Sequence, residues 1–184
     1  EISACLVGSE MCIRDSSKRA NIAPNTPLYK DGKIFFCHGY NINGVMLQLS
    51  DDLKSVSVVW RTDVLDTHHG GYVEGNGTIY GSNWINNNQG NWCAIDWNTG
   101  AKGYETTWTG GKGKGSIIAA DGMLYCYDER RGAVALVNPD PAKFDIVSEF
   151  RITKGVGPHW AHPVIVNGVL YIRHGFALMA YKMK

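Results

Sequence analysis

Short apolar runs separated by polar turns recur along the chain, and no helical periodicity lies between them. An aliphatic and then an aromatic residue stand at matched positions in Ile34-Phe35, Ile79-Tyr80, Leu124-Tyr125 and Leu170-Tyr171. Because alternate residues of a strand face opposite sides, each copy presents the same apolar side chains to its neighbours. The pattern predicts a repeated set of short β-strands and excludes a helical solenoid.

A turn dipeptide precedes each of these runs at regular spacing. The pairs are Asp31-Gly32, Asn76-Gly77, Asp121-Gly122 and Asn167-Gly168, and their glycines lie 45, 45 and 46 residues apart. Asn-Gly and Asp-Gly between two apolar runs are typical of a type I′ hairpin turn, which needs a positive φ at both central residues. We therefore expect four β-hairpins.

Each hairpin is followed by two further candidate strands. The third strands are expected at Val45 to Leu49, Trp92 to Ile95, Ala133 to Val137 and Ala177 to Tyr181, and the fourth strands end in Trp60, Trp108 and Phe150. Four antiparallel strands in about 45 residues are typical of a propeller blade. The expected fold is an all-β propeller with about four blades, approximately 24–66, 67–110, 111–156 and 157–184, the last without its outer strand.

The second repeat carries the most informative motif. Its Gly90-Asn91-Trp92-Cys93-Ala94-Ile95-Asp96-Trp97-Asn98-Thr99-Gly100 resembles the PQQ-like (quinoprotein-type) β-propeller repeat, in which an Ala-x-Asp stretch runs into a Thr-Gly turn. The resemblance covers 24–184 and is weaker in the third repeat, where Asn138-Pro139-Asp140-Pro141 replaces the Thr-Gly turn. It implies a ring of six to eight blades, of which this chain is a C-terminal fragment, in the periplasm or at the cell surface of a bacterium.

The N-terminal residues 1–16 are expected to be non-native, because Glu10 to Ser16 resembles the translation of a sequencing adapter. The propeller domain is then expected to span 17–184. Cys37, Cys93 and Cys126 remain, without zinc-ligand spacing, and are expected to be buried as small hydrophobic side chains.

Charge and hydropathy limit the classes of partner that the chain is expected to bind. The formal net charge is +1 and no Lys/Arg run stands out, so the electrostatic pattern of a nucleic-acid-binding protein is absent from the sequence. No stretch approaches the roughly 20 apolar residues that span a bilayer. We expect neither nucleic acid as a partner nor a transmembrane segment in this chain.

Blade topology divides the loops between two ends of the blades. Loops joining second to third strands and loops joining successive blades share one end, which we define as the mouth face. Binding residues concentrate on loops held by a rigid scaffold. The candidate ligand-binding residues on the mouth face are His68, His69, Trp84, Lys114, Glu129, Arg130, His159, Trp160, His162, Arg173 and His174. Imidazole and ammonium groups between indole walls suit a sugar, a polyol or an anionic cofactor, although glycine-rich loops and buried aromatic residues also serve structure alone.

Metal and nucleotide sites are less well supported. The side chains of His68 and His69 would point to opposite faces if that segment were extended, and no metal is expected. Lys112-Gly113-Lys114-Gly115 lacks the phosphate-loop pattern and leads into a strand.

Two functions compete. The sequence favours the non-catalytic branch of the family, which would bind a small sugar or polyol or a cell-envelope protein and need no cofactor. The alternative is a fragment of a PQQ-dependent alcohol or polyol dehydrogenase, which would hold PQQ with calcium. Such dehydrogenases usually carry an adjacent Cys-Cys pair, which this sequence lacks. No residue is assigned as catalytic. If the mouth face holds a catalytic carboxylate, Glu129 is the candidate.

Overall fold

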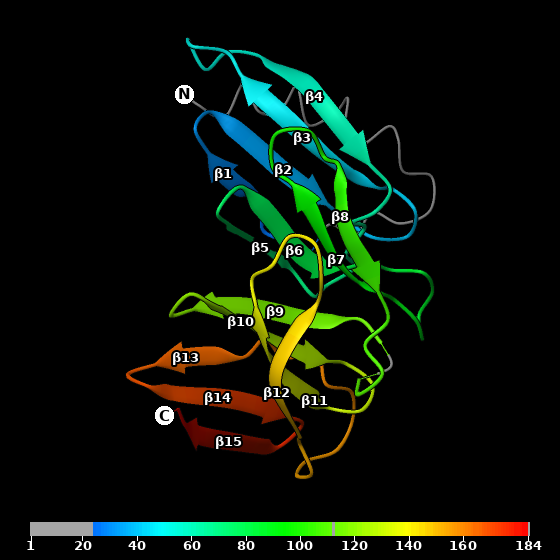
Figure 1. Cartoon of the computed structure of the whole chain (residues 1–184), viewed down its shortest axis with the longest axis vertical. Helices are drawn as coiled ribbons and strands as arrows, with labels where there is room; N and C mark the ends of the chain where they lie inside the picture. Colours follow the sequence, from blue (N-terminus) through cyan, green and yellow to red (C-terminus); the bar gives the residue numbers. More distant parts are fainter. Residues whose placement is uncertain (1–23, 112, 184) are drawn as a thin grey trace.

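The computed structural model describes residues 24–111 and 113–183, and every element in this range is a β-strand. The expectation about residues 1–16 lies outside the described residues. Four antiparallel sheets follow one another down the long axis of the molecule (Figure 1). The all-β fold predicted from the repeat is confirmed.

Each sheet is a blade whose strands pair in chain order. Blade 1 contains β1 (Leu28–Lys30), β2 (Lys33–Cys37), β3 (Gly44–Leu49) and β4 (Val56–Thr62), and blade 2 contains β5 (Tyr72–Gly75), β6 (Thr78–Ser82), β7 (Trp92–Asp96) and β8 (Lys102–Thr106). Blade 3 contains β9 (Gly115–Ala120), β10 (Met123–Asp128), β11 (Ala133–Asn138) and β12 (Asp145–Arg151), and blade 4 contains β13 (Val164–Val166), β14 (Val169–His174) and β15 (Ala177–Lys182).

The four hairpin turns have the geometry expected from their sequence. Asp31, Asn76, Asp121 and Asn167 have φ between 51° and 52°, and each following glycine also has a positive φ. A left-handed conformation at both central residues is the mark of a type I′ turn, whose twist matches that of the flanking strands. These turns lie together at the left of Figure 1, so the mouth-face loops lie at the opposite ends of the strands.

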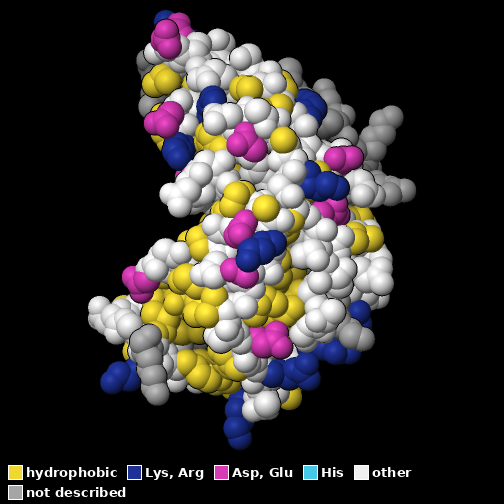
Figure 2. Space-filling model, in the orientation of Figure 1, with side chains coloured by type: hydrophobic (Ala, Val, Ile, Leu, Met, Phe, Trp, Pro, Cys, Tyr) yellow, Lys and Arg dark blue, Asp and Glu magenta, His cyan; other side chains and the backbone are white. Residues whose placement is uncertain are grey.

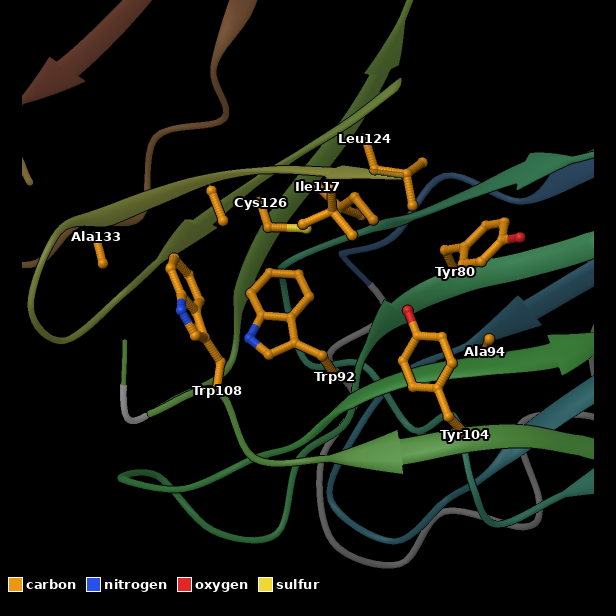
Figure 3. Packing of buried hydrophobic residues seen from close by; sticks show 11 residues of the cluster. Tyr80, Trp92, Ala94, Tyr104, Trp108, Ile117, Leu124, Cys126 and Ala133 are labelled. Atoms are coloured by element: carbon orange, nitrogen blue, oxygen red, sulfur yellow. The ribbon is translucent and has the colours of Figure 1, made fainter. Parts of the chain in front are cut away.

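Apolar side chains fill the spaces between successive blades. Between blades 2 and 3, the indole of Trp92 lies edge-on to Trp108 with ring centroids 6.0 Å apart, and Phe144 stacks on Trp92 at 5.5 Å. Ile117, Leu124 and other residues of blade 3 close this cluster from the far side (Figure 3). The blades are therefore held face to face by burial of large side chains.

The three predicted ends of the fourth strands differ from the structure. β8 ends at Thr106, and Trp108 lies in the loop that follows. The prediction that Trp108 ends a strand is wrong, because its indole turns between blades, where it is buried and donates from Nε1 to Glu149 Oε2 at 2.9 Å. β4 continues past Trp60 to Thr62, and β12 continues past Phe150 to Arg151.

Close backbone contact joins blades 2 and 3 at their inner strands. Ile117 N donates to Gly70 O at 3.1 Å, and Ser82 Oγ bonds both the amide and the carbonyl of Gly115. A Cβ at Gly70 would lie 1.9 Å from Gly115 O, so only glycine allows this approach. The contact fixes the loop that carries His68 and His69 against blade 3.

Candidate functional site

A hollow of about 360 Å³ opens where the first strands of all four blades begin. Its lining residues come from the segment before β1, from the start of β5, from β9 and from the segment before β13: Pro24, Asn25, Thr26, His69, Gly71, Tyr72, Ile117 and His162. The hollow therefore lies on the channel side of the blades. Two of the predicted ligand-binding residues, His69 and His162, line it.

Asn25 organises the loop that presents His68 and His69. Its side-chain nitrogen donates to Thr67 O at 2.8 Å and to His68 O at 3.0 Å, and its oxygen accepts from Gly71 N at 3.2 Å. The loop is bent, so the rings of His68 and His69 lie near each other with centroids 4.8 Å apart, rather than on opposite faces as an extended segment would place them.

His69 lies next to a buried charge pair that does not line the hollow. Its Nε2 lies 3.1 Å from Glu129 Oε2, while Lys114 Nζ pairs with the other oxygen, Oε1. Burial raises the pKa of Glu129, but hydrogen bonds and charges from His69 and Lys114 outweigh burial and hold that pKa below its usual range. Glu129 is therefore an anion that lies beside the ring of His69.

Lys114 uses all of its hydrogen-bonding capacity within the protein. Besides Glu129, its Nζ donates to Asn86 O at 3.3 Å and to Asn87 O at 3.1 Å. An ammonium group has three N–H donors, and all three are engaged. Lys114 thus pins the β6–β7 loop to blade 3, and we place it behind the hollow as a positioning residue.

Tyr40, which the sequence analysis missed, forms an aromatic group with two predicted residues. Its hydroxyl lies 2.9 Å from His68 Nε2, and its ring centroid is 5.0 Å from that of Trp84. Asp66 accepts from the backbone N–H groups of Asn41 and Asn43 and so stabilises this left-handed loop, in which Tyr40 has a φ of 61°. Tyr40 could have been found by the reasoning that selected Trp84, because both lie in second-to-third strand loops.

His159 and His174 are buried and hold the loops of blades 3 and 4 together. Their rings stack with centroids 3.7 Å apart, and Tyr127 Oη bonds His159 Nδ1. Both ring nitrogens of His174 lie 2.7 Å from carbonyl oxygens, those of Lys154 and Gly157. A carbonyl oxygen only accepts, so both contacts are hydrogen bonds when both nitrogens carry a proton. Neither ring lines the hollow.

The buried ring of His159 predicts a loss of stability in acid. Burial and the neighbouring His174 lower the pKa of His159 to about 4, from 6.5 for an unperturbed histidine. The unfolded chain therefore takes up this proton first as pH falls, and stability is lost between pH values of about 6.5 and 4. His159→Gln removes the titration, so the difference in melting temperature between wild type and variant should narrow across this window. If the melting temperatures of wild type and variant change with pH in parallel, the lowered pKa of His159 is contradicted.

Of the remaining predicted residues, His162 lines the hollow, whereas Trp160, Arg130 and Arg173 do not. Trp160 is exposed, with its ring edge-on to His69 at 5.4 Å, and His162 Nε2 donates to His69 O at 2.9 Å. Arg130 donates to Asn88 O at 3.0 Å and Arg173 to Gly175 O at 3.1 Å, and both are exposed. Lys112 is outside the described residues.

The described part of the chain contains neither a candidate metal cluster nor a candidate membrane-spanning helix. Residues 24–111 and 113–183 bring no three His, Cys, Asp or Glu side chains together as a metal site, and they contain no helix long and apolar enough to cross a membrane. Cys37, Cys93 and Cys126 are buried free thiols. Burial raises the pKa of Cys37 to about 12, so this thiol is held protonated.

Neither a scan against protein-family models nor a search of the curated proteins finds a match. Solved structures do match. BamB from Moraxella catarrhalis has a TM-score of 0.63 at 14% identity, over 87% of this chain and 46% of that one. The quinohemoprotein alcohol dehydrogenase ADHIIG from Pseudomonas putida HK5 has a TM-score of 0.54 at 15% identity, over 84% of this chain and 29% of that one. Glutaminyl cyclase from Myxococcus xanthus has a TM-score of 0.50 at 19% identity, over 88% of this chain and 66% of that one.

The chain thus spans about half of the BamB structure and less than a third of the dehydrogenase. At these identities the likeness shows the fold and no activity. The four sheets are blades of a β-propeller similar in fold to BamB and to PQQ-type dehydrogenases, as the repeat predicts.

Proposed function

We propose that this propeller binds a small polyhydroxylated ligand, a sugar or a polyol, in the hollow at the mouth face. The observation that carries the proposal is the hollow itself, because it brings His69 and His162 from different blades to one opening. Ligand pockets commonly measure about 300–1,000 Å³, and a hollow of about 360 Å³ suits a ligand of monosaccharide size.

The chemistry around the hollow supports a hydroxylated ligand. An imidazole ring offers a donor and an acceptor, which match the two roles of a hydroxyl group. The ring of His69 lies between Glu129, His68 and Trp160, and the exposed indole of Trp160 offers a flat apolar surface. Pre-oriented polar groups reduce the ordering cost of binding.

The residues present fit PQQ with calcium poorly. Calcium takes about six to eight oxygen ligands, several of them carboxylates. Asp66 is committed to the amides of Asn41 and Asn43, Glu129 to Lys114 and His69, and one oxygen of Asp128 to the amides of Arg130 and Arg131. We therefore propose a protein that needs no cofactor, and derive no step through the quinone. A location in the bacterial cell envelope is part of the same proposal.

Calorimetric titration of the full-length protein with a panel of sugars and polyols tests this function. We expect one class to bind, and His162→Ala and Trp160→Ala each to weaken binding by about tenfold or more. Leu53→Ala, an exposed residue at the opposite end of blade 1, is the matched control. If no sugar or polyol binds, or if both site variants bind like wild type, the proposal fails. Tight binding of PQQ with calcium would favour the dehydrogenase alternative.

A further inference from the structure

The mouth-face loops of blades 3 and 4 carry exposed charge of one sign. Arg130 and Arg131 lie between β10 and β11, Lys154 lies between β12 and β13, and Arg173 lies at the end of β14, all of them exposed. The acids of the β10–β11 loop, Asp128 and Glu129, are buried. Within residues 24–111 and 113–183, none of the four cations takes part in an ion pair. Figure 2 shows Lys and Arg side chains gathered at the lower right, where these loops lie in Figure 1.

Large apolar side chains are exposed on the same loops. Phe176 is 82% exposed, Val156 62% and Trp160 59%. Single exposed apolar residues are ordinary, but three among four cations form a patch of mixed character. We call the four cations and these three residues the basic apolar patch.

Buried contacts join the loops that form the basic apolar patch. His174 bonds the carbonyls of Lys154 and Gly157, and a Cβ at Gly175 would lie 2.3 Å from Val156 O. His159 N donates to Glu129 O at 3.3 Å, which ties the β12–β13 loop to the β10–β11 loop. The patch is therefore a preorganised surface, and the stacked pair of His159 and His174 lies beneath it.

We propose that the basic apolar patch docks an acidic segment of a partner protein that also carries apolar side chains. Three of the four cations are arginine, whose planar guanidinium binds a carboxylate with two parallel hydrogen bonds. Arginine and aromatic residues are enriched at protein interfaces, whereas lysine is depleted there. This composition favours a protein segment over an anionic membrane surface.

The patch lies outside the hollow, so this inference does not rest on sugar binding. Only Trp160 stands beside both sites, and it is left unchanged in the test.

Selection of a random peptide library on the folded protein tests the inference. We expect the selected peptides to be enriched in Asp and Glu together with apolar residues. The double variant Arg130→Glu, Arg131→Glu should weaken the binding of those peptides by about tenfold or more, and Phe176→Ser should weaken it independently. The control is Lys54→Glu, Lys143→Glu, which makes the same change of charge in two turns at the opposite end of the blades.

Three outcomes would overturn the proposal. The first is a selection without enrichment of acids, and the second is binding that the patch variants leave unchanged while their melting temperatures match wild type. The third is a selection without acidic peptides, combined with binding to vesicles of phosphatidylcholine and phosphatidylglycerol. If the same patch variants abolish the vesicle binding, the patch is a membrane-binding surface.

Discussion

Replacing Lys114 by methionine is expected to destabilise the propeller by about 3–5 kcal/mol, because it removes the ammonium group that pairs with the buried Glu129 and leaves only His69 beside that charge. The two side chains are only 5% and 6% exposed. The change also leaves the carbonyls of Asn86 and Asn87 without the donor that binds them. Urea unfolding at neutral pH measures the loss, and for a chain of this length the melting temperature should fall by about 6–20 °C.

The matched control for Lys114 is Lys143, which pairs with Asp145 at the surface. Lys143→Met should cost less than about 1 kcal/mol, because an exposed ion pair is screened by water. The double variant Lys114→Met, Glu129→Leu removes both charges and should recover most of the lost stability. A single Lys114→Met variant as stable as wild type would show that the pair does not hold the loop.

The hairpins could be predicted because their determinants are local. Two adjacent residues that accept a positive φ, Asn or Asp and then Gly, are enough to specify a type I′ turn, and the flanking alternation sets the register. The same topology predicts that His68, His69, His159, His162 and His174 lie on or next to the mouth-face loops. No knowledge of contacts between blades was needed for either step.

The arrangement of the site could not be predicted, because it depends on which side chains meet across blades. Lys114 and Glu129 were selected as ligand-binding residues by their loops, and the structure places them behind the hollow as partners of each other. His159 and His174 stack on each other beneath the surface. Asn25 bonds residues more than 40 positions away, and no local pattern marks it.

Trp108 shows how packing overrides a strand pattern. The aromatic residue that recurs near the end of each fourth strand predicts that the strand of blade 2 ends at Trp108, two positions after the observed end. The gap between blades 2 and 3 is filled by this indole, so the chain leaves the sheet at Thr106 and turns inward. β8 ends opposite the first residue of its partner strand, because Thr106 pairs with Trp92, and the side chain of Trp108 is then free to pack between the blades.

Replacing Trp108 by alanine is therefore expected to cost about 3–5 kcal/mol, since the substitution leaves a cavity between blades 2 and 3 beside Trp92 and Phe144. The indole is 2% exposed, so the surrounding side chains have little room to collapse into the space. Thermal unfolding should show a melting temperature lower by about 6–20 °C.

Two controls separate packing from hydrogen bonding at Trp108. Trp108→Phe keeps part of the ring contact and loses the second ring and the N–H donor to the exposed carboxylate of Glu149, so it should cost less than the alanine variant. Trp160→Ala removes an indole that is largely exposed and should change stability by no more than about 0.5 kcal/mol. Equal melting temperatures for Trp108→Ala and Trp160→Ala would mean that the blades do not depend on this contact, and that the chain ends β8 early for another reason.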